Sequence, residues 1–554
     1  MSLQSNWNEK LPLDTAEIGR EILAANNPYR LIGDKVNDFL TLDLFAPMYS
    51  DLGRGGICPM VLALVTVFQF LENIPDRVAA QCVVTRIDWK YALHAPLSWK
   101  GFHYSDLCNF RRRLIENGAE RLVFDRVLQW VHALGFLKRH RKQRTDSTHI
   151  VGNVERMSRL ELAWETLRVT LREIKATAPQ WYGQVIPAVF HEVYVKRQSD
   201  WRLSKAEVKA AMQKVGQDGF WLLDRLEEGT PERVLALKEV DTFRTVWEQQ
   251  FERKEGQTIV RKPPIKGKHV ITSPHDPEAR WSKKRSTEWV GYKLQVTETA
   301  ETEKDEDEEK DEQGGESETV HFITDIDVTA SNEGDSEALD EIQERLIERD
   351  LKPEEHGVDQ GYVSGPNLAR SAKRGIELLG PAPTSQGNKS EGYQQSDFKL
   401  DLEAQKAICP QGQESVRWKT YAAPEAPDDP DRREIKVCFG AACQGCPVRS
   451  QCTSSQSGRT LTISAFYDEL SARRAEQQDE AFQQRLHWRA GVEGTLSGLV
   501  HGHGARRARY RGKTKVRLQA YFIGAAANLK RLARAMEARE KHQQQLKVGV
   551  GVSC

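Results

Sequence analysis

Five short strand-like segments, far apart in the chain, constrain the fold more than any other feature. Alternating and β-branched residues predict strands at 144–151, 289–296, 319–328, 357–362 and 376–380. An amphipathic helix is predicted between the third and fourth of them, over Ser336–Asp350. Strands and a helix in this order are typical of one α/β sheet. The long tracts between the strands must then be insertions.

Two long tracts, one before the first strand and one between the first and second strands, are helical in pattern. From about residue 27 to 138, apolar periodicity predicts helices at 60–72, 106–117 and 123–137, with Pro59 opening the first and Ser105 capping the second. A second helical tract, rich in Glu, Lys, Arg and Trp, extends from about residue 157 to 255. We therefore expect a helical module before the sheet and a helical insertion within it.

The third tract, 386–456, is rich in Gly, Pro and Ser and carries a cysteine cluster. Five of the nine cysteines lie there, and a tetrahedral zinc site suits a segment with so few apolar residues. Free or oxidised cysteines and an iron–sulfur cluster are the alternatives. The spacing does not decide whether Cys409 or Cys438 would be the fourth ligand. The candidate zinc ligands are Cys409, Cys438, Cys443, Cys446 and Cys452.

The net charge of zero, from 80 basic and 80 acidic residues, hides two opposite blocks. Residues 298–318 hold twelve acidic residues and two lysines, and we predict a solvated loop at a hairpin tip, away from any catalytic group. The basic segment Arg506–Arg517, with Tyr510, is a candidate phosphate-contacting surface. The longest apolar run, Met60–Leu71, is well short of the ~20 residues of a membrane span. With no secretory signal at the N-terminus, we expect a cytoplasmic protein without a membrane partner.

Three carboxylates stand out by their context. Asp146 lies on the first predicted strand and Asp359 closes a later one. Glu493 lies on a helix predicted over Phe482–Ser497, one turn after Arg489. Oxygen ligands from two strand ends and a helix suit a pair of Mg²⁺ ions acting on a phosphodiester.

The strand 144–149, the turn 359–364 and the pair Arg489 and Glu493 together resemble a known family. They are similar to bacterial insertion-sequence DDE transposases with a Tyr-Arg-Glu-Lys type of signature. The chain is most like the "eleven-eighty-two" branch, which carries a cysteine-bearing insert. The similarity extends from about residue 27 to 532.

This resemblance implies an RNase H-like fold in which Asp146, Asp359 and Glu493 bind two Mg²⁺ ions, with Mn²⁺ able to substitute. It implies hydrolysis of DNA at the ends of the element, followed by attack of the freed 3′-hydroxyl on target DNA. The partners would be double-stranded DNA, as terminal inverted repeats and target, and a second copy of the chain on paired ends. In the cell the protein would lie at the bacterial nucleoid.

The chain departs from the family's signature at two of its four positions. Leu486 stands at the Tyr position and Val500 at the Lys position. Two alternatives to an active transposase therefore stay open. One is a catalytically inactive, transposase-derived DNA-binding protein, and the other is a metal-dependent nuclease without strand transfer.

The resulting prediction is an α/β protein with four parts. Residues 27–140 form a helical module that binds the element's ends, and 141–365 form the first part of the core, with a helical insertion at about 157–255. Residues 366–456 hold the last core strand and the Cys-rich insertion, and 457–541 complete the core with a basic tail. The candidate DNA-binding residues are Arg111, Arg112, Arg113, Arg489, Arg506, Arg507, Arg509, Arg511 and Lys513.

Overall fold

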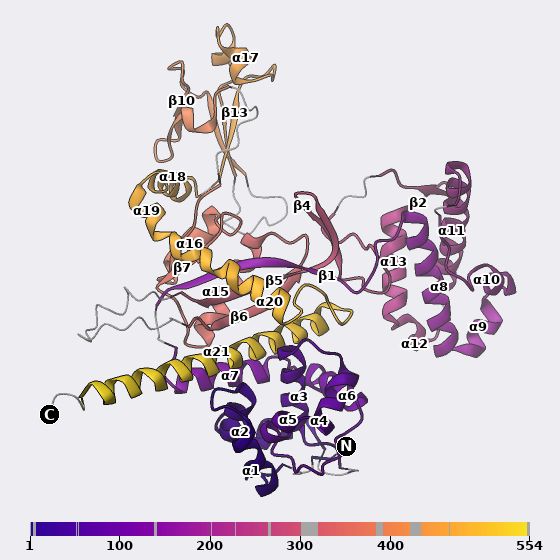
Figure 1. Cartoon of the computed structure of the whole chain (residues 1–554). Helices are drawn as coiled ribbons and strands as arrows, with labels where there is room; N and C mark the ends of the chain where they lie inside the picture. The colour runs from indigo at the N-terminus through magenta and orange to yellow at the C-terminus, as the bar shows by residue number, and fades with distance from the viewer. Residues whose placement is uncertain are drawn as a thin grey trace.

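The computed structural model is a mixed α/β protein built around one mixed sheet (Figure 1). It describes residues 2–3, 7–50, 53, 55–137, 141–200, 202–227, 229–263, 267–300, 320–383, 392–421, 434–464 and 466–550. In these ranges, no helix is both long enough and apolar enough to cross a membrane.

The sheet has six strands, with β5 and β1 at its centre. Its order is β4-β5-β1-β7-β8, and β6 also pairs with β5. β1 is antiparallel to β5 and parallel to β7, which is in turn parallel to β8. An antiparallel half joined to a parallel half is consistent with the expected RNase H-like core. The strands are β1 (Gln143–Val151), β4 (Arg280–Lys284), β5 (Thr287–Thr299), β6 (Ile323–Ala330), β7 (Glu355–Val358) and β8 (Glu377–Leu379).

The N-terminal helices share one hydrophobic core with the sheet. The long helix α21 (Lys513–Val550) joins them, because it packs against β6 and also against α3 and α7 (Figure 1). The expected N-cap is wrong: Ser105 is the first residue of α6, and its hydroxyl is 2.7 Å from Nδ1 of His103. The N-terminal elements are α1 (Leu13–Ile22), α2 (Pro28–Phe39), η1 (Leu42–Leu44), η2 (Ala46–Met48), α3 (Pro59–Leu71), α4 (Asp76–Thr85), α5 (Ile87–Ala92), α6 (Ser105–Glu116) and α7 (Leu122–Ala133).

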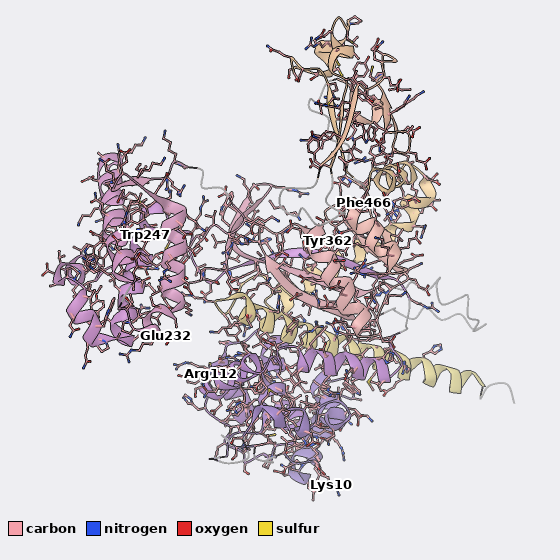
Figure 2. All side chains as sticks on the ribbon, turned by 180° about the vertical axis from the view of Figure 1, so that it is seen from behind. Lys10, Arg112, Glu232, Trp247, Tyr362 and Phe466 are labelled. Atoms are coloured by element: carbon pink, nitrogen blue, oxygen red, sulfur yellow. The ribbon has the colours of Figure 1, made fainter. Side chains whose placement is uncertain are left out.

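The helical tract between β1 and β4 has a hydrophobic core of its own. Capping boxes at Ser158 and Ser204 start its two longest helices, and Trp247 fills the space beside Gly219 at its centre (Figure 2). The tract ends in a short hairpin rather than a helix. Its elements are α8 (Arg159–Thr177), α9 (Pro179–Val185), α10 (Ala188–Val193), α11 (Lys205–Arg225), α12 (Glu232–Leu235), α13 (Lys238–Gln250), β2 (Phe251–Lys254) and β3 (Gln257–Val260).

The cysteine tract projects from the sheet and contains more β-structure than its composition indicates (Figure 1). A three-stranded sheet, β11-β12-β13, stands beside the hairpin of β9 and β10. Among the described residues of this tract, six form the buried apolar core. Its elements are η3 (Gln395–Asp397), β9 (Lys399–Asp401), β10 (Lys406–Ile408), β11 (Arg417–Tyr421), β12 (Glu434–Cys438), η5 (Gly440–Cys443), α17 (Arg449–Cys452) and β13 (Thr460–Ser464).

Helices cover the rest of the sheet. α15 (Asp335–Glu348) and α16 (Gly365–Lys373) lie between the later strands, and α15 agrees with the predicted helix. The single helix predicted over 482–497 is wrong. The chain instead forms α18 (Tyr467–Glu476), α19 (Glu480–Arg485), the 3₁₀ turn η6 (His487–Gly491) and α20 (Val492–Gly502). The break has a packing cause, because Trp488 in η6 lies 2.6 Å from the point that a Cβ on Gly357 would occupy.

Candidate active site

Two of the predicted catalytic carboxylates lie side by side. Thr145 of β1 is the parallel partner of Val358 in β7, so Asp146 and Asp359 follow at the same level of adjacent strands. Burial, and then the charge of Asp359, raise the pKa of Asp146 from 3.8 to about 6. The backbone N–H of Ser147 opposes this rise by donating to Asp146 over 2.7 Å. The sheet thus holds two carboxylates that repel each other.

Positive groups also reach this pair. Lys284 and Arg489 each lower the pKa of Asp146 by their charge, although burial outweighs them. Arg489 belongs to the 3₁₀ turn η6 rather than to the helix on which the sequence analysis placed it. Lys284 ends β4, and sequence reasoning missed it because nothing in its local pattern links it to β1.

A third carboxylate, Asp335 at the start of α15, joins the two aspartates. It accepts a hydrogen bond of 3.1 Å from the Ser147 hydroxyl and forms an ion pair of 3.1 Å with Lys293. The point that a Cβ on Gly361 would occupy is 3.0 Å from Oδ1 of Asp359 and 3.3 Å from Oδ2 of Asp335. Asp335 was not singled out from the sequence as a site residue, although it lies within the part of the chain that resembles the family.

Tyr362, labelled in Figure 2, lies close enough to this cluster to sense its charges. Its side chain is fully buried, and its hydroxyl donates to the side-chain carbonyl of Gln295 in β5. Burial, and then the charges of Asp335 and Asp146, raise the pKa of Tyr362 well above its ordinary value. The hydroxyl therefore stays protonated near the carboxylates.

The third predicted acid, Glu493, is exposed on the first turn of α20. The buried residues of this helix include Val492 and Thr495, and α20 packs across β1 and β5. In the described ranges, no three His, Cys, Asp or Glu side chains are grouped so that they would hold a metal as they stand. The structure therefore brings Asp146, Asp359 and Asp335 together and leaves Glu493 on the neighbouring helix.

A buried ion cluster anchors that helix. Glu298, with no exposed surface, forms ion pairs of 2.7 Å with Arg144 in β1 and 3.0 Å with Arg531 in α21. It also accepts a hydrogen bond of 2.5 Å from Thr495, two residues after Glu493. Arg144 in turn donates to the carbonyl of Trp488 in η6 over 2.6 Å.

Glu298 corrects the prediction for the acidic run. We expected 298–318 to be a solvated loop separate from the catalytic groups, yet Glu298 lies within β5, where it pairs with Arg144 of β1 and Ile323 of β6, and it is buried. Its charge is tolerated because two guanidinium groups pair with it. Residues 301–319 lie outside the described residues.

The three consecutive arginines of α6 differ in their surroundings. Arg111 is buried, pairs with Asp76 over 2.5 Å and lies over the ring of Tyr510 at 5.2 Å. The prediction that Arg111 binds DNA is therefore wrong, because this side chain is buried and its charge is paired inside the protein. Arg113 donates to a backbone carbonyl, whereas Arg112 has 68% of its side chain exposed.

The residues of the basic segment after α20 also differ in their surroundings. Arg506 and Arg509 donate to backbone carbonyls of His149 and Ile74, over 2.7 Å each, and tie the segment to β1 and to the turn between α3 and α4. Tyr510 packs against the core rather than facing solvent. Arg507 and Arg511 are exposed and Lys513 is half-buried, and their contact with DNA stays a prediction.

Two family models match the chain. One, described as "Transposase DDE domain", matches residues 408–533, and the other, "Transposase domain (DUF772)", matches residues 17–113. These matches indicate similarity to DDE transposases and to a further transposase domain, over less than half of the chain in total. The first match includes Glu493 and the five candidate zinc ligands, whereas Asp146 and Asp359 lie outside both. No curated protein and no solved structure matches the chain.

Proposed function

We propose that this transposase cuts DNA at the ends of its own insertion sequence and joins those ends to target DNA. The observation that carries the proposal is the placement of Asp146 and Asp359 on adjacent parallel strands, with the pKa of Asp146 raised to about 6. Two close carboxylates without an intervening cation repel each other, and a bound cation would relieve that cost. The donor set therefore fits Mg²⁺ or Mn²⁺, both of which prefer oxygen ligands.

We assign the metal to Asp146 and Asp359, with Glu493 completing the set from α20. When bound there, Mg²⁺ supplies charge neutralisation at the phosphodiester and activates the attacking oxygen. Asp146 must be ionised to take part, and its raised pKa in the metal-free chain means that a proton competes with the metal there as pH falls. Arg489 brings positive charge to Asp146, where the phosphate would lie. Glu298 and Arg144 hold η6 and α20 at the sheet.

Domain roles follow from this placement. We assign binding of the element's ends to the N-terminal helices 27–140, whose exposed Arg112 faces solvent, and to Arg507, Arg511 and Lys513 beyond α20. Two ends must be cut for one element to move, so we expect two copies of the chain to act together.

The test compares wild type with Asp146→Asn, Asp359→Asn and Glu493→Gln on labelled DNA that carries the element's terminal sequence. We expect each substitution to reduce cleavage in Mg²⁺ by at least ~10²-fold, since charge stabilisation at the reacting centre is lost. Binding in a mobility-shift assay should persist. Unreduced cleavage in any of the three variants would remove that residue from the active site.

One observation favours the inactive DNA-binding alternative. Leu486 and Val500 replace two signature residues, and Val500 packs against the hydrophobic core rather than offering a polar group. Specific binding without cleavage in either Mg²⁺ or Mn²⁺ would establish that alternative. Cleavage without joined products would instead establish a nuclease.

A further inference from the structure

The cysteine tract contains a second cluster of reactive side chains, remote from the carboxylates. Cys409, Cys443, Cys446 and Cys452 all line one small cavity of ≈ 30 Å³, which is closed by apolar groups such as Phe398. Burial raises the pKa of Cys452, and the other three thiols raise it further. The four sulfurs are therefore close neighbours, although they come from segments up to 43 residues apart.

Backbone amides point at two of these sulfurs. The N–H of Gln413 donates to the sulfur of Cys409, and the N–H of Arg459 donates to the sulfur of Cys443, both over 3.3 Å. Gly412 and Gly445, with φ of +77° and +81°, allow the tight turns that follow Cys409 and Cys443. Amide donors on sulfur stabilise negative charge there.

Arg459 provides an independent sign that negative charge belongs in this cavity. Its side chain lines the cavity and is 5% exposed, and one of its nitrogens donates to the carbonyl of Cys452 over 2.9 Å. Its Nε has no hydrogen-bond partner, and among the residues that the structure describes no carboxylate pairs with it. A buried guanidinium without a counter-ion is costly. Four thiolates around one divalent cation would leave net negative charge beside it.

We propose that Cys409, Cys443, Cys446 and Cys452 form a structural zinc site. The cavity has room for a single ion. Since the described chain contains no preformed group of three ligands, binding must draw the thiols inward. The described part of the tract has six buried apolar residues, a small core for that length, and a bound metal commonly stabilises such segments.

Cys438 is excluded from this site, which settles the choice that the spacing left open. Its sulfur accepts hydrogen bonds from Arg417 over 3.7 Å and Thr460 over 3.5 Å, beside β12 and away from the cavity lining. Burial acts to raise the pKa of Cys438, but these two donors lower it overall. Cys438 is therefore a matched control within the same tract.

The test measures zinc in the full chain, purified under reducing conditions and dialysed against metal-free buffer. We expect about one zinc per chain in wild type and in Cys438→Ser, and less than about 0.2 in Cys446→Ser. Cys446→His, which keeps a ligand, should retain zinc even if the serine variant does not fold. Co²⁺ exchanged into wild type should show the absorption bands of tetrahedral thiolate ligation.

Three outcomes would overturn the proposal. They are a metal-free wild type, stoichiometric iron in place of zinc, and loss of zinc in Cys438→Ser with retention in Cys409→Ser. None of these measurements depends on DNA cleavage, so their result is separate from that of the proposed function.

Discussion

The carboxylate cluster and the thiol cavity both hold acidic groups close together, but the hydrophobic cores that support them differ greatly in size. Both gather negative groups from segments far apart in sequence. The carboxylates lie on or next to elements of a sheet whose core is continuous with the N-terminal helices. The thiols lie on short helical segments and turns around six buried residues of the described tract. The sheet can therefore hold its acids in place before any metal binds, and the cysteine tract cannot. We therefore expect a site supported by few buried apolar residues to need its metal for folding, and a site supported by a large hydrophobic core to fold without it.

The largest expected effect of this difference is on protease sensitivity. Removing thiol-bound metal with a chelator should increase cleavage within 392–464 by at least ~10-fold, because the metal supplies most of that tract's folding free energy. The sheet and the helical tract 159–250 should resist as before. Limited proteolysis with mass spectrometry checks this, and equal sensitivity of both regions would abolish the contrast.

The second prediction concerns the rigidity of the sheet itself. Glu298→Ala leaves the guanidinium groups of Arg144 and Arg531 buried without their counter-ion, and should lower the free energy of unfolding by about 3–5 kcal/mol. Glu288→Ala, which breaks only exposed ion pairs of β5, should change it by less than about 1 kcal/mol. Urea denaturation measures both. Equal losses would mean that the ion cluster does not anchor the sheet.

The third prediction uses the pH dependence of stability without metal. The pKa of Asp146 is about 6 in the folded chain and near 3.8 when unfolded, so the native state binds the proton more tightly. The contribution of Asp146 to stability is thus present below pH 3.8 and is lost as pH rises through about 6. Asp146→Asn should therefore melt higher than wild type at pH 7.5, with a smaller difference at pH 4.

Mg²⁺ added at pH 7.5 should raise the melting temperature of wild type more than that of Asp146→Asn. A difference between the two chains that is independent of pH would show that burial of Asp146 carries no cost.

The smallest expected effect is that of a single lysine. Lys284→Ala removes a positive charge that lowers the pKa of Asp146. The acidic limb of the cleavage profile should then move to higher pH by a few tenths of a unit. The neighbouring Lys283→Ala is the control, since Lys283 pairs with Glu288 over 3.0 Å. Identical shifts in both variants would point to a general charge effect.

Local patterns predicted most of the elements correctly. Five of the six core strands and α15 follow from alternation and amphipathic spacing, which are properties of neighbouring residues, whereas β4 was not predicted. Asp146 and Asp359 were singled out because each lies in or directly after a predicted strand within a family-like motif, and their catalytic role stays a prediction. The break before α20 was not found, because it depends on Trp488 packing against Gly357, more than 100 residues away.

Charge was where sequence reasoning failed most clearly. Glu298 looks like the first member of an acidic loop and Arg111 like part of a DNA-binding stripe, yet both are buried in ion pairs. Burial of a charged group depends on partners supplied by distant elements, here Arg531 and Asp76. Counting the charged residues of a segment therefore cannot show which of them are buried.

The sequence by itself determined the α/β class and the helical and cysteine-rich tracts, and it singled out Asp146 and Asp359 as candidates, since these inferences rest on periodicity, composition and short motifs. Only the tertiary structure decided which charges face solvent, that Asp335 joins the aspartates, and that Cys409 rather than Cys438 lines the cavity. The physical reason is the same in each case. Strand register and helix packing bring distant segments into contact, and these contacts decide which polar groups are buried and which partners they have. The free energy of such a contact does not depend on how far apart its residues lie in the sequence.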